Sequence, residues 1–214
     1  LGASVRLEHG YVLTSVPGGR LRGARFRFAQ PTVTGTENLL MAAALAEGTT
    51  VLENCAREPE VEDLSRLLVA MGAQIEGIGG DRLTIEGVSA LRGAEHRIVA
   101  DRIEGGTYLL AAAITGGDVR LDDCDPRALQ PLADKLALAG AEIEIGDTTL
   151  RVVAPRPLRA VDATTAPHPG FPTDLQAQYM ALMTQAQGTA ILCETVFENR
   201  FQHVPELCRM GADV

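Results

Sequence analysis

Residues 60–73 read EVEDLSRLLVAMGA, and this stretch decides the local fold. Apolar residues from Val61 to Met71 recur at helical spacing, so that one face of the segment is apolar and the other is charged. Gly72 favours the end of a helix. The stretch therefore predicts an amphipathic helix over residues 60–70, packed on a core through one face.

Strand patterns surround this helix. Alternating or β-branched residues predict strands, glycines between two of them predict a hairpin, and a run that is apolar all round predicts a buried helix. These signals give strands over 24–29, 49–53, 74–76 and 82–86, and a buried helix over 36–46. The predicted order is βαβαββ.

The pattern repeats along the chain about every 70 residues. A Gly-Ala pair after an apolar residue recurs at Leu1-Gly2-Ala3, Met71-Gly72-Ala73, Ala139-Gly140-Ala141 and Met210-Gly211-Ala212. A second marker keeps the same period at Gly48-Thr49, Gly117-Asp118 and Gly188-Thr189. Two markers in step predict structural repeats of this length.

The second repeat is expected to copy the βαβαββ order of the first. Its elements are helices over 108–114 and 131–139, a strand over 119–121, and a hairpin over 143–145 and 149–153. A third repeat begins with a helix over 175–186. We therefore expect the tail of one repeat (1–16), two whole repeats (about 17–90 and 91–157), and a third that breaks off at Val214.

Glycines and hydroxyl residues precede the three helices expected to be buried. They occur in residues 32–36, 104–107 and 171–174. The first N–H groups of a helix can hold a phosphate or carboxylate, and glycine lets the ligand approach the backbone. Ordinary capping explains the same residue types. If the helices point the same way, their starts should meet at one site.

Composition narrows the class of protein. The chain has 214 residues, 46% of them hydrophobic, and a formal net charge of −9. This charge disfavours partners such as nucleic acid or an anionic membrane, which are bound by basic surfaces. The four cysteines have no metal-ligand spacing, so we expect no metal and no cofactor, and reduced thiols in a cytoplasmic protein.

Three motifs resemble those of one enzyme family. They are AREPEV at 56–61, TAPHPGFPTDLQAQ at 165–178, and ETVFENRF at 194–201 followed by HVPEL at 203–207. They are similar to motifs of the UDP-N-acetylglucosamine 1-carboxyvinyltransferases, which are enolpyruvyl transferases. The resemblance covers essentially the whole chain.

The resemblance implies an α/β fold, the inside-out α/β barrel. In this fold six βαβαββ repeats with buried central helices form two domains of three repeats each. On this template residues 1–97 are the C-terminal part of one domain. Residues 98–214 are about two repeats of the second, truncated at the C-terminus.

The resemblance also implies a reaction. The enolpyruvyl group of phosphoenolpyruvate passes to the 3-hydroxyl of UDP-N-acetylglucosamine, and phosphate is released, in the first committed step of peptidoglycan synthesis. The family's reactive-cysteine loop is expected upstream of Leu1, and none of the four cysteines matches its context. We therefore expect a fragment that is inactive alone.

The motifs carry the candidate site residues. Asp174 matches the catalytic aspartate that takes the proton of the sugar hydroxyl, and it would also contact substrate. The other substrate-binding candidates are Gln30, Pro31, Thr32, Val33, Val196 and Arg200. Gln30 stands where the family often has a basic residue, so backbone N–H groups would carry the diphosphate there.

Four of the site residues have a simpler alternative. Asp174 and Thr32 could merely cap helices, Arg200 could form a structural ion pair, and Val196 could lie in a core strand. For the whole chain, two alternatives stay open. One is an enolpyruvyl transferase of the shikimate-pathway type, and the other is a non-catalytic protein that binds a nucleotide sugar.

Overall fold

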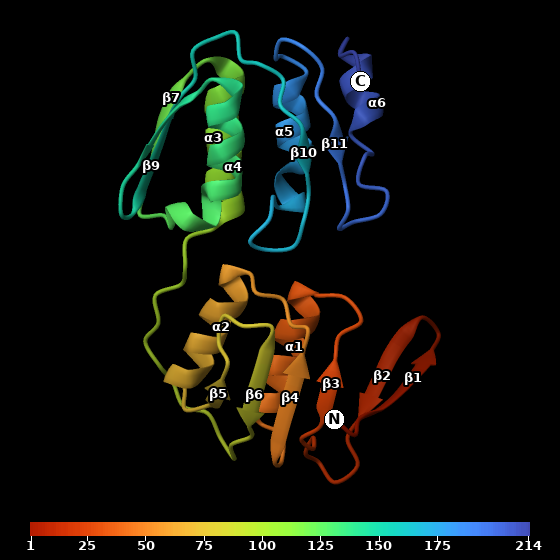
Figure 1. Cartoon of the computed structure of the whole chain (residues 1–214). Coiled ribbons are helices and arrows are strands. Elements are labelled where there is room, and N and C mark those ends of the chain that lie inside the picture. The colour runs from red at the N-terminus through yellow and green to blue at the C-terminus, as the bar shows by residue number, and fades with distance from the viewer. The chain divides into compact units, whose positions relative to one another are not determined.

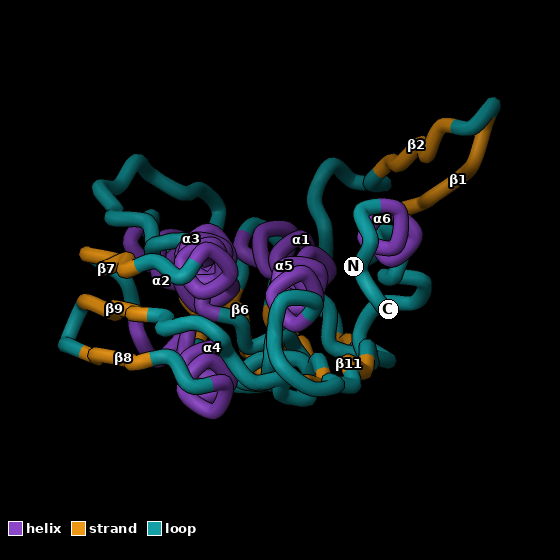
Figure 2. Tube along the Cα trace, turned by 90° about the horizontal axis from the view of Figure 1, so that it is seen from above, coloured by secondary structure: helices purple, strands orange, loops and turns teal.

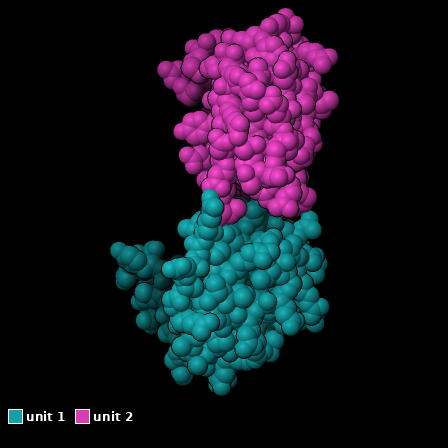
Figure 3. Space-filling model, turned by 90° about the vertical axis from the view of Figure 1, so that its left-hand side faces the viewer, with its two compact units in different colours: residues 1–98 teal, residues 99–214 magenta.

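The computed structural model describes residues 1–214 and divides into two compact units, Leu1–Ile98 and Val99–Val214 (Figure 3). The boundary between them follows Ile98. That each unit belongs to a larger domain of three repeats stays a prediction. No helix in either unit is both long and apolar enough to span a bilayer.

The first unit contains a four-stranded sheet with two helices (Figure 1). Its elements are β1 (Ser4–Glu8), β2 (Tyr11–Ser15), β3 (Arg25–Arg27), α1 (Val33–Ala44), β4 (Thr49–Glu53), α2 (Pro59–Ala70), β5 (Gln74–Glu76) and β6 (Arg82–Glu86). The strand order is β3-β4-β6-β5, with β3 and β4 parallel and the other pairs antiparallel. The expected βαβαββ order is confirmed here. Strands β1 and β2 form a separate antiparallel hairpin.

Alternation in the strands makes the core of this unit. Leu52 of β4 pairs with Leu83 of β6, and both are buried together with Leu40 of α1. One face of the sheet therefore packs on the helices. The prediction that α1 is buried all round is wrong for one side, because Met41 is 45% exposed.

The second unit is built around three helices. Its elements are α3 (Arg102–Thr115), β7 (Asp118–Asp122), α4 (Pro126–Ala139), β8 (Glu142–Ile145), β9 (Thr149–Val153), β10 (Ala163–Thr164), the 3-10 helix η1 (Thr173–Leu175), α5 (Gln176–Met183), β11 (Leu192–Cys193) and α6 (Val204–Arg209). The sheets are β7-β9-β8 and a parallel β10-β11 pair. No strand precedes α3 in this unit, so the second repeat lacks the leading strand that we expected.

Helices α3, α4 and α5 run in the same direction within the second unit, and Figure 2 shows them end-on. Leu109, Leu136 and Tyr179, one from each helix, are fully buried in their shared core. Gln178 donates a hydrogen bond to the hydroxyl of Thr107, with the two atoms 3.1 Å apart. The second turn of α3 and the first turn of α5 therefore lie side by side.

The predicted start of α3 is wrong. The helix begins at Arg102, where the Asp101 carboxylate accepts hydrogen bonds from two backbone N–H groups of the first turn. Gly105 and Gly106 therefore lie inside the helix and cannot receive an anion. A β-carbon on Gly106 would lie 2.5 Å from a methyl carbon of Leu175. Glycine at this position lets η1 pack closely against α3.

The predicted start of α4 is also wrong. Pro131 looks like a helix start in the sequence, but it lies inside the helix. The helix begins at Pro126 and is capped by Asp125, whose carboxylate accepts a hydrogen bond from the N–H of Arg127. Proline suits the first helical position because the N–H that it lacks would have no partner there.

Gly87 tests the packing of the first unit. A β-carbon at this position would overlap the backbone carbonyl of Ala46, and backbone cannot move aside as a side chain can. We expect Gly87→Ala to lower the free energy of unfolding by about 1–3 kcal/mol, measured by urea denaturation of the full-length protein. Gly93→Ala is the control, because no heavy atom lies within 4 Å of its added carbon. Equal stability of the two variants would contradict the packing described here.

Candidate active site

The side chains of Asp174 and Arg200 meet in the second unit. Asp174 lies in η1 and Arg200 in the turn after β11, and the Arg200 Nη2 to Asp174 Oδ1 distance is 2.5 Å. The two side chains are 49% and 35% exposed, respectively. The Oδ2 atom of Asp174 accepts no hydrogen bond from the chain, so it is open to a ligand.

Asp174 and Arg200 differ in how far their simpler structural alternatives hold. Asp174 caps no backbone N–H, because η1 has no side-chain cap. Arg200 does form an ion pair, as its alternative proposed, but its partner is Asp174 itself. The same two residues can therefore form a structural ion pair and take part in the chemistry.

Two further contacts hold the Arg200 guanidinium. Its Nη1 donates a hydrogen bond to the Thr173 hydroxyl at 2.9 Å, and its central carbon lies 5.3 Å from the centre of the Phe197 ring. A guanidinium over an aromatic face is attracted by the ring quadrupole. These two contacts hold the Arg200 guanidinium in place beside Asp174.

Glu194 contacts Thr173 and is not one of the candidates from the sequence. Its Oε2 accepts a hydrogen bond from Thr173, and its Oε1 accepts from Thr165, Val196 and Phe197. Burial raises the pKa of the Glu194 carboxyl, but these hydrogen bonds outweigh burial and the pKa is lowered. The only signal in the sequence is a carboxylate directly after an apolar strand.

Val196 does not lie in a strand. It follows β11 in a bend, and its side chain is exposed. Its backbone N–H already donates to Glu194 at 2.8 Å. A contact between Val196 and a substrate would therefore use the carbonyl oxygen or the side chain.

The candidates from Gln30 to Val33 form the start of α1 in the first unit. Thr32 caps the helix, because its Oγ1 accepts a hydrogen bond from Gly35 N at 3.3 Å. Val33 is the first helical residue, and an N–H at this position has no partner within the helix. The capping alternative for Thr32 is therefore real, and it leaves the Val33 N–H available.

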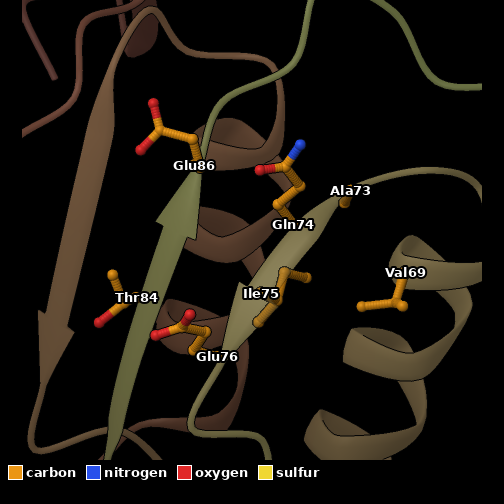
Figure 4. A pocket seen from close by; sticks show the side chains of 7 residues that line it. All are labelled: Val69, Ala73, Gln74, Ile75, Glu76, Thr84 and Glu86. Carbon is orange, nitrogen blue, oxygen red and sulfur yellow. The ribbon is translucent and has the colours of Figure 1, made fainter.

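Two hollows, one in each unit, lie apart from these residues. In the first unit a cavity of about 390 Å³ lies beside β5, β6 and the end of α2, and it includes Glu76 and Glu86 (Figure 4). In the second unit a cavity of about 680 Å³ lies at the C-terminal ends of α3 and α5, beside Arg156. Neither contains a candidate site residue. No group of three or more acidic, histidine or cysteine side chains is placed to share a metal ion.

Comparison with known proteins assigns the chain to a family. The sequence model of EPSP synthase (3-phosphoshikimate 1-carboxyvinyltransferase) matches residues 1–214. A UDP-N-acetylglucosamine 1-carboxyvinyltransferase of Anaeromyxobacter dehalogenans (strain 2CP-C) is 58% identical over 214 residues, which are 100% of this chain and 51% of that protein. One of Sorangium cellulosum (strain So ce56) is 57% identical over 215 residues, 100% of this chain and 50% of the relative.

Solved structures agree with the sequence relatives. The enolpyruvyl transferase NikO from Streptomyces tendae superposes with a TM-score of 0.85 at 27% identity, over 96% of this chain and 52% of that one. An EPSP synthase from Acinetobacter baumannii, at 22% identity and a TM-score of 0.65, shares the fold over 99% of this chain and 51% of its own. The chain belongs to the enolpyruvyl transferase family of EPSP synthase. It spans about half the length of the curated relatives that it matches.

Proposed function

We propose that the protein transfers the enolpyruvyl group of phosphoenolpyruvate to the 3-hydroxyl of UDP-N-acetylglucosamine. The observation that carries the proposal is the exposed Asp174 carboxylate, which Arg200 holds through one oxygen while the other is open. The names of the relatives at 57–58% identity supply the acceptor. The activity would belong to peptidoglycan synthesis in the cytoplasm, a compartment that suits four free thiols.

Asp174 would act as the general base. The sugar oxygen forms a bond to C2 of phosphoenolpyruvate while its proton passes to Oδ2 of Asp174. A second proton is added to the methylene carbon, and we assign that acid to no residue of this chain. Loss of phosphate and of one methyl proton then gives the enolpyruvyl ether. The role asks for a carboxylate that is fixed and accessible, and Asp174 is both.

Arg200 would bind negative charge on the substrates. Two of its nitrogens hold Thr173 and Asp174, and its side chain is partly exposed. A guanidinium has five N–H donors, so donors remain for a phosphate or carboxylate. Arg200 would thus place an anionic group of the substrate next to the base.

The start of α1 would receive the diphosphate of the nucleotide sugar. Helix N-termini bind phosphate through unpaired N–H groups and the positive end of the helix dipole. Gln30 and Pro31 are exposed beside this start, and the Val33 N–H is available. The role therefore rests on backbone donors and needs no basic side chain at position 30.

Val33→Pro tests this role of the helix start. Proline removes the N–H, but the first helical position tolerates it, and Thr32 already has the extended backbone that precedes proline readily. We expect UDP-N-acetylglucosamine binding to weaken by about 1–3 kcal/mol in calorimetry of the full-length protein. Val33→Ala keeps the N–H and should bind normally. Unchanged affinity of Val33→Pro would leave Thr32 as an ordinary cap.

A second candidate acceptor is favoured by the family description, which names 3-phosphoshikimate. The two acceptors are separated by one assay of the full-length protein. Phosphate release from phosphoenolpyruvate is measured with each acceptor in turn. We expect release with UDP-N-acetylglucosamine and not with 3-phosphoshikimate. The opposite result would replace the proposed acceptor, and binding of the nucleotide sugar without phosphate release would favour a non-catalytic binding protein.

A further inference from the structure

We propose that Glu194 is a positioning residue, which aims the Arg200 guanidinium at Asp174 through the hydroxyl of Thr173. The inference rests on the proposed function, because it gives Glu194 a part in aligning that same site. Glu194 does not touch Asp174 or Arg200 itself. Its effect would pass through one hydrogen bond to Thr173, at 2.9 Å.

Glu194 joins three segments that are separate in the sequence. Thr165 follows β10, Thr173 begins η1, and Val196 and Phe197 form the bend after β11. All four donate to the same carboxylate at 2.8–2.9 Å. Thr173 directly precedes Asp174, and Phe197 provides the ring beneath Arg200. The carboxylate therefore ties together the surroundings of both members of the ion pair.

The charge of Glu194 decides which way the Thr173 hydroxyl points. A carboxylate can only accept, so Thr173 must donate its single proton to Oε2 of Glu194. The lone pairs of the hydroxyl are then left to accept from Nη1 of Arg200 at 2.9 Å. This fixes one edge of the guanidinium, and Nη2 reaches Asp174 at 2.5 Å.

A neutral amide at position 194 would no longer fix the direction of the hydrogen bonds at the Thr173 hydroxyl. Glutamine could donate its N–H to Thr173, and the Thr173 hydroxyl proton would then lose the acceptor that Oε2 of Glu194 provides. The orientation of the hydroxyl would no longer be fixed, so its hydrogen bond from Nη1 of Arg200 would weaken. The lowered pKa of the Glu194 carboxyl agrees with a group that stays ionised and can only accept.

The first experiment compares kcat and KM of the full-length protein and its variants. Misalignment of reacting groups by about 1 Å can cost about 100-fold in rate, so we expect Glu194→Gln and Thr173→Val each to lower kcat by about 10- to 100-fold. Thr173→Ser restores the hydroxyl and should return most of the activity. Thr115→Val is the matched control: it removes a hydroxyl that donates to the Ala111 and Ala112 carbonyls of its own helix, away from the Glu194 network, so kcat should stay within about twofold of the parent.

The double variant separates positioning from a general structural role. If both residues act through one hydrogen bond, Glu194→Gln with Thr173→Val should be no slower than the slower single variant. Multiplied losses would overturn the proposal. So would an unchanged kcat in Thr173→Val, a variant that keeps the size of the side chain and tests the same link if Glu194→Gln fails to fold.

A readout without turnover keeps this inference distinct from the proposed function. NMR of the protein labelled with nitrogen-15 in arginine reports whether the Arg200 guanidinium rotates freely. We expect hindered rotation in the parent and free rotation in Glu194→Gln and in Thr173→Val. Hindered rotation in all three would overturn the positioning role. A parent that shows the expected rotation but releases no phosphate with UDP-N-acetylglucosamine would instead count against the proposed function.

Discussion

Asp174→Asn in the full-length protein should lower turnover by about 100- to 10,000-fold, the range expected for loss of a general base. Asparagine keeps the size of the side chain and one oxygen for Arg200, so the contact at Nη2 can persist. The amide cannot take the proton of a sugar hydroxyl. Because Asp174 caps no helix N–H, the fold should tolerate the change. The measurement is phosphate release, with melting temperature and UDP-N-acetylglucosamine affinity taken on the same sample.

Asp134→Asn is the matched control for this substitution. Asp134 is an exposed carboxylate on α4 in the same unit, and it accepts a hydrogen bond from Gln130 at 2.6 Å. The same chemical change there should leave turnover close to that of the parent. Near-normal turnover of Asp174→Asn, with a folded protein and normal affinity, would remove Asp174 from the catalytic role.

Local signals in the sequence predicted the strands and the order of the first repeat well. Alternation in β4 and β6 places Leu52 opposite Leu83 in the core, and that pattern can be read without any partner. The helix starts were harder. Gly105 and Gly106 resemble a break, but the cap at Asp101 lies further back, and the reason for Gly106 is its contact with Leu175. A local sequence pattern cannot reveal a contact between two residues, Gly106 and Leu175, that lie almost 70 positions apart.

The candidate site shows the same contrast between residues that a sequence motif reveals and residues that only their contacts reveal. Asp174 and Arg200 lie in recognisable motifs, and the structure brings their side chains together. Glu194 was missed because what distinguishes it is its set of partners. Thr165 and Thr173 lie 29 and 21 residues away in the sequence, and hydroxyl residues at such distances are not a motif. The network exists only once β10, η1 and β11 are folded against one another.

Arg200→Lys should lower kcat by about 100- to 1,000-fold, the range found when one preorganised donor to a reacting centre is lost. The guanidinium reaches Thr173 with Nη1 and Asp174 with Nη2 at the same time. A lysine ammonium keeps the charge, but it is a single point and has no planar fork. It would bind one partner and release the other, so charge alone should not rescue the rate.

Arg151→Lys is the control that decides whether this loss belongs to the site. Arg151 also uses its fork, reaching Asp118 at 2.6 and 2.8 Å and Glu144 at 2.9 Å, but it lies in β9 on the face of the sheet β7-β9-β8 opposite the buried Leu150 and Val152. Exposed ion pairs contribute about 0–1 kcal/mol to stability, so this variant should fold and keep its turnover. If Arg200→Lys loses no more activity than Arg151→Lys, the fork at Arg200 is structural only, and Asp174 does not depend on it.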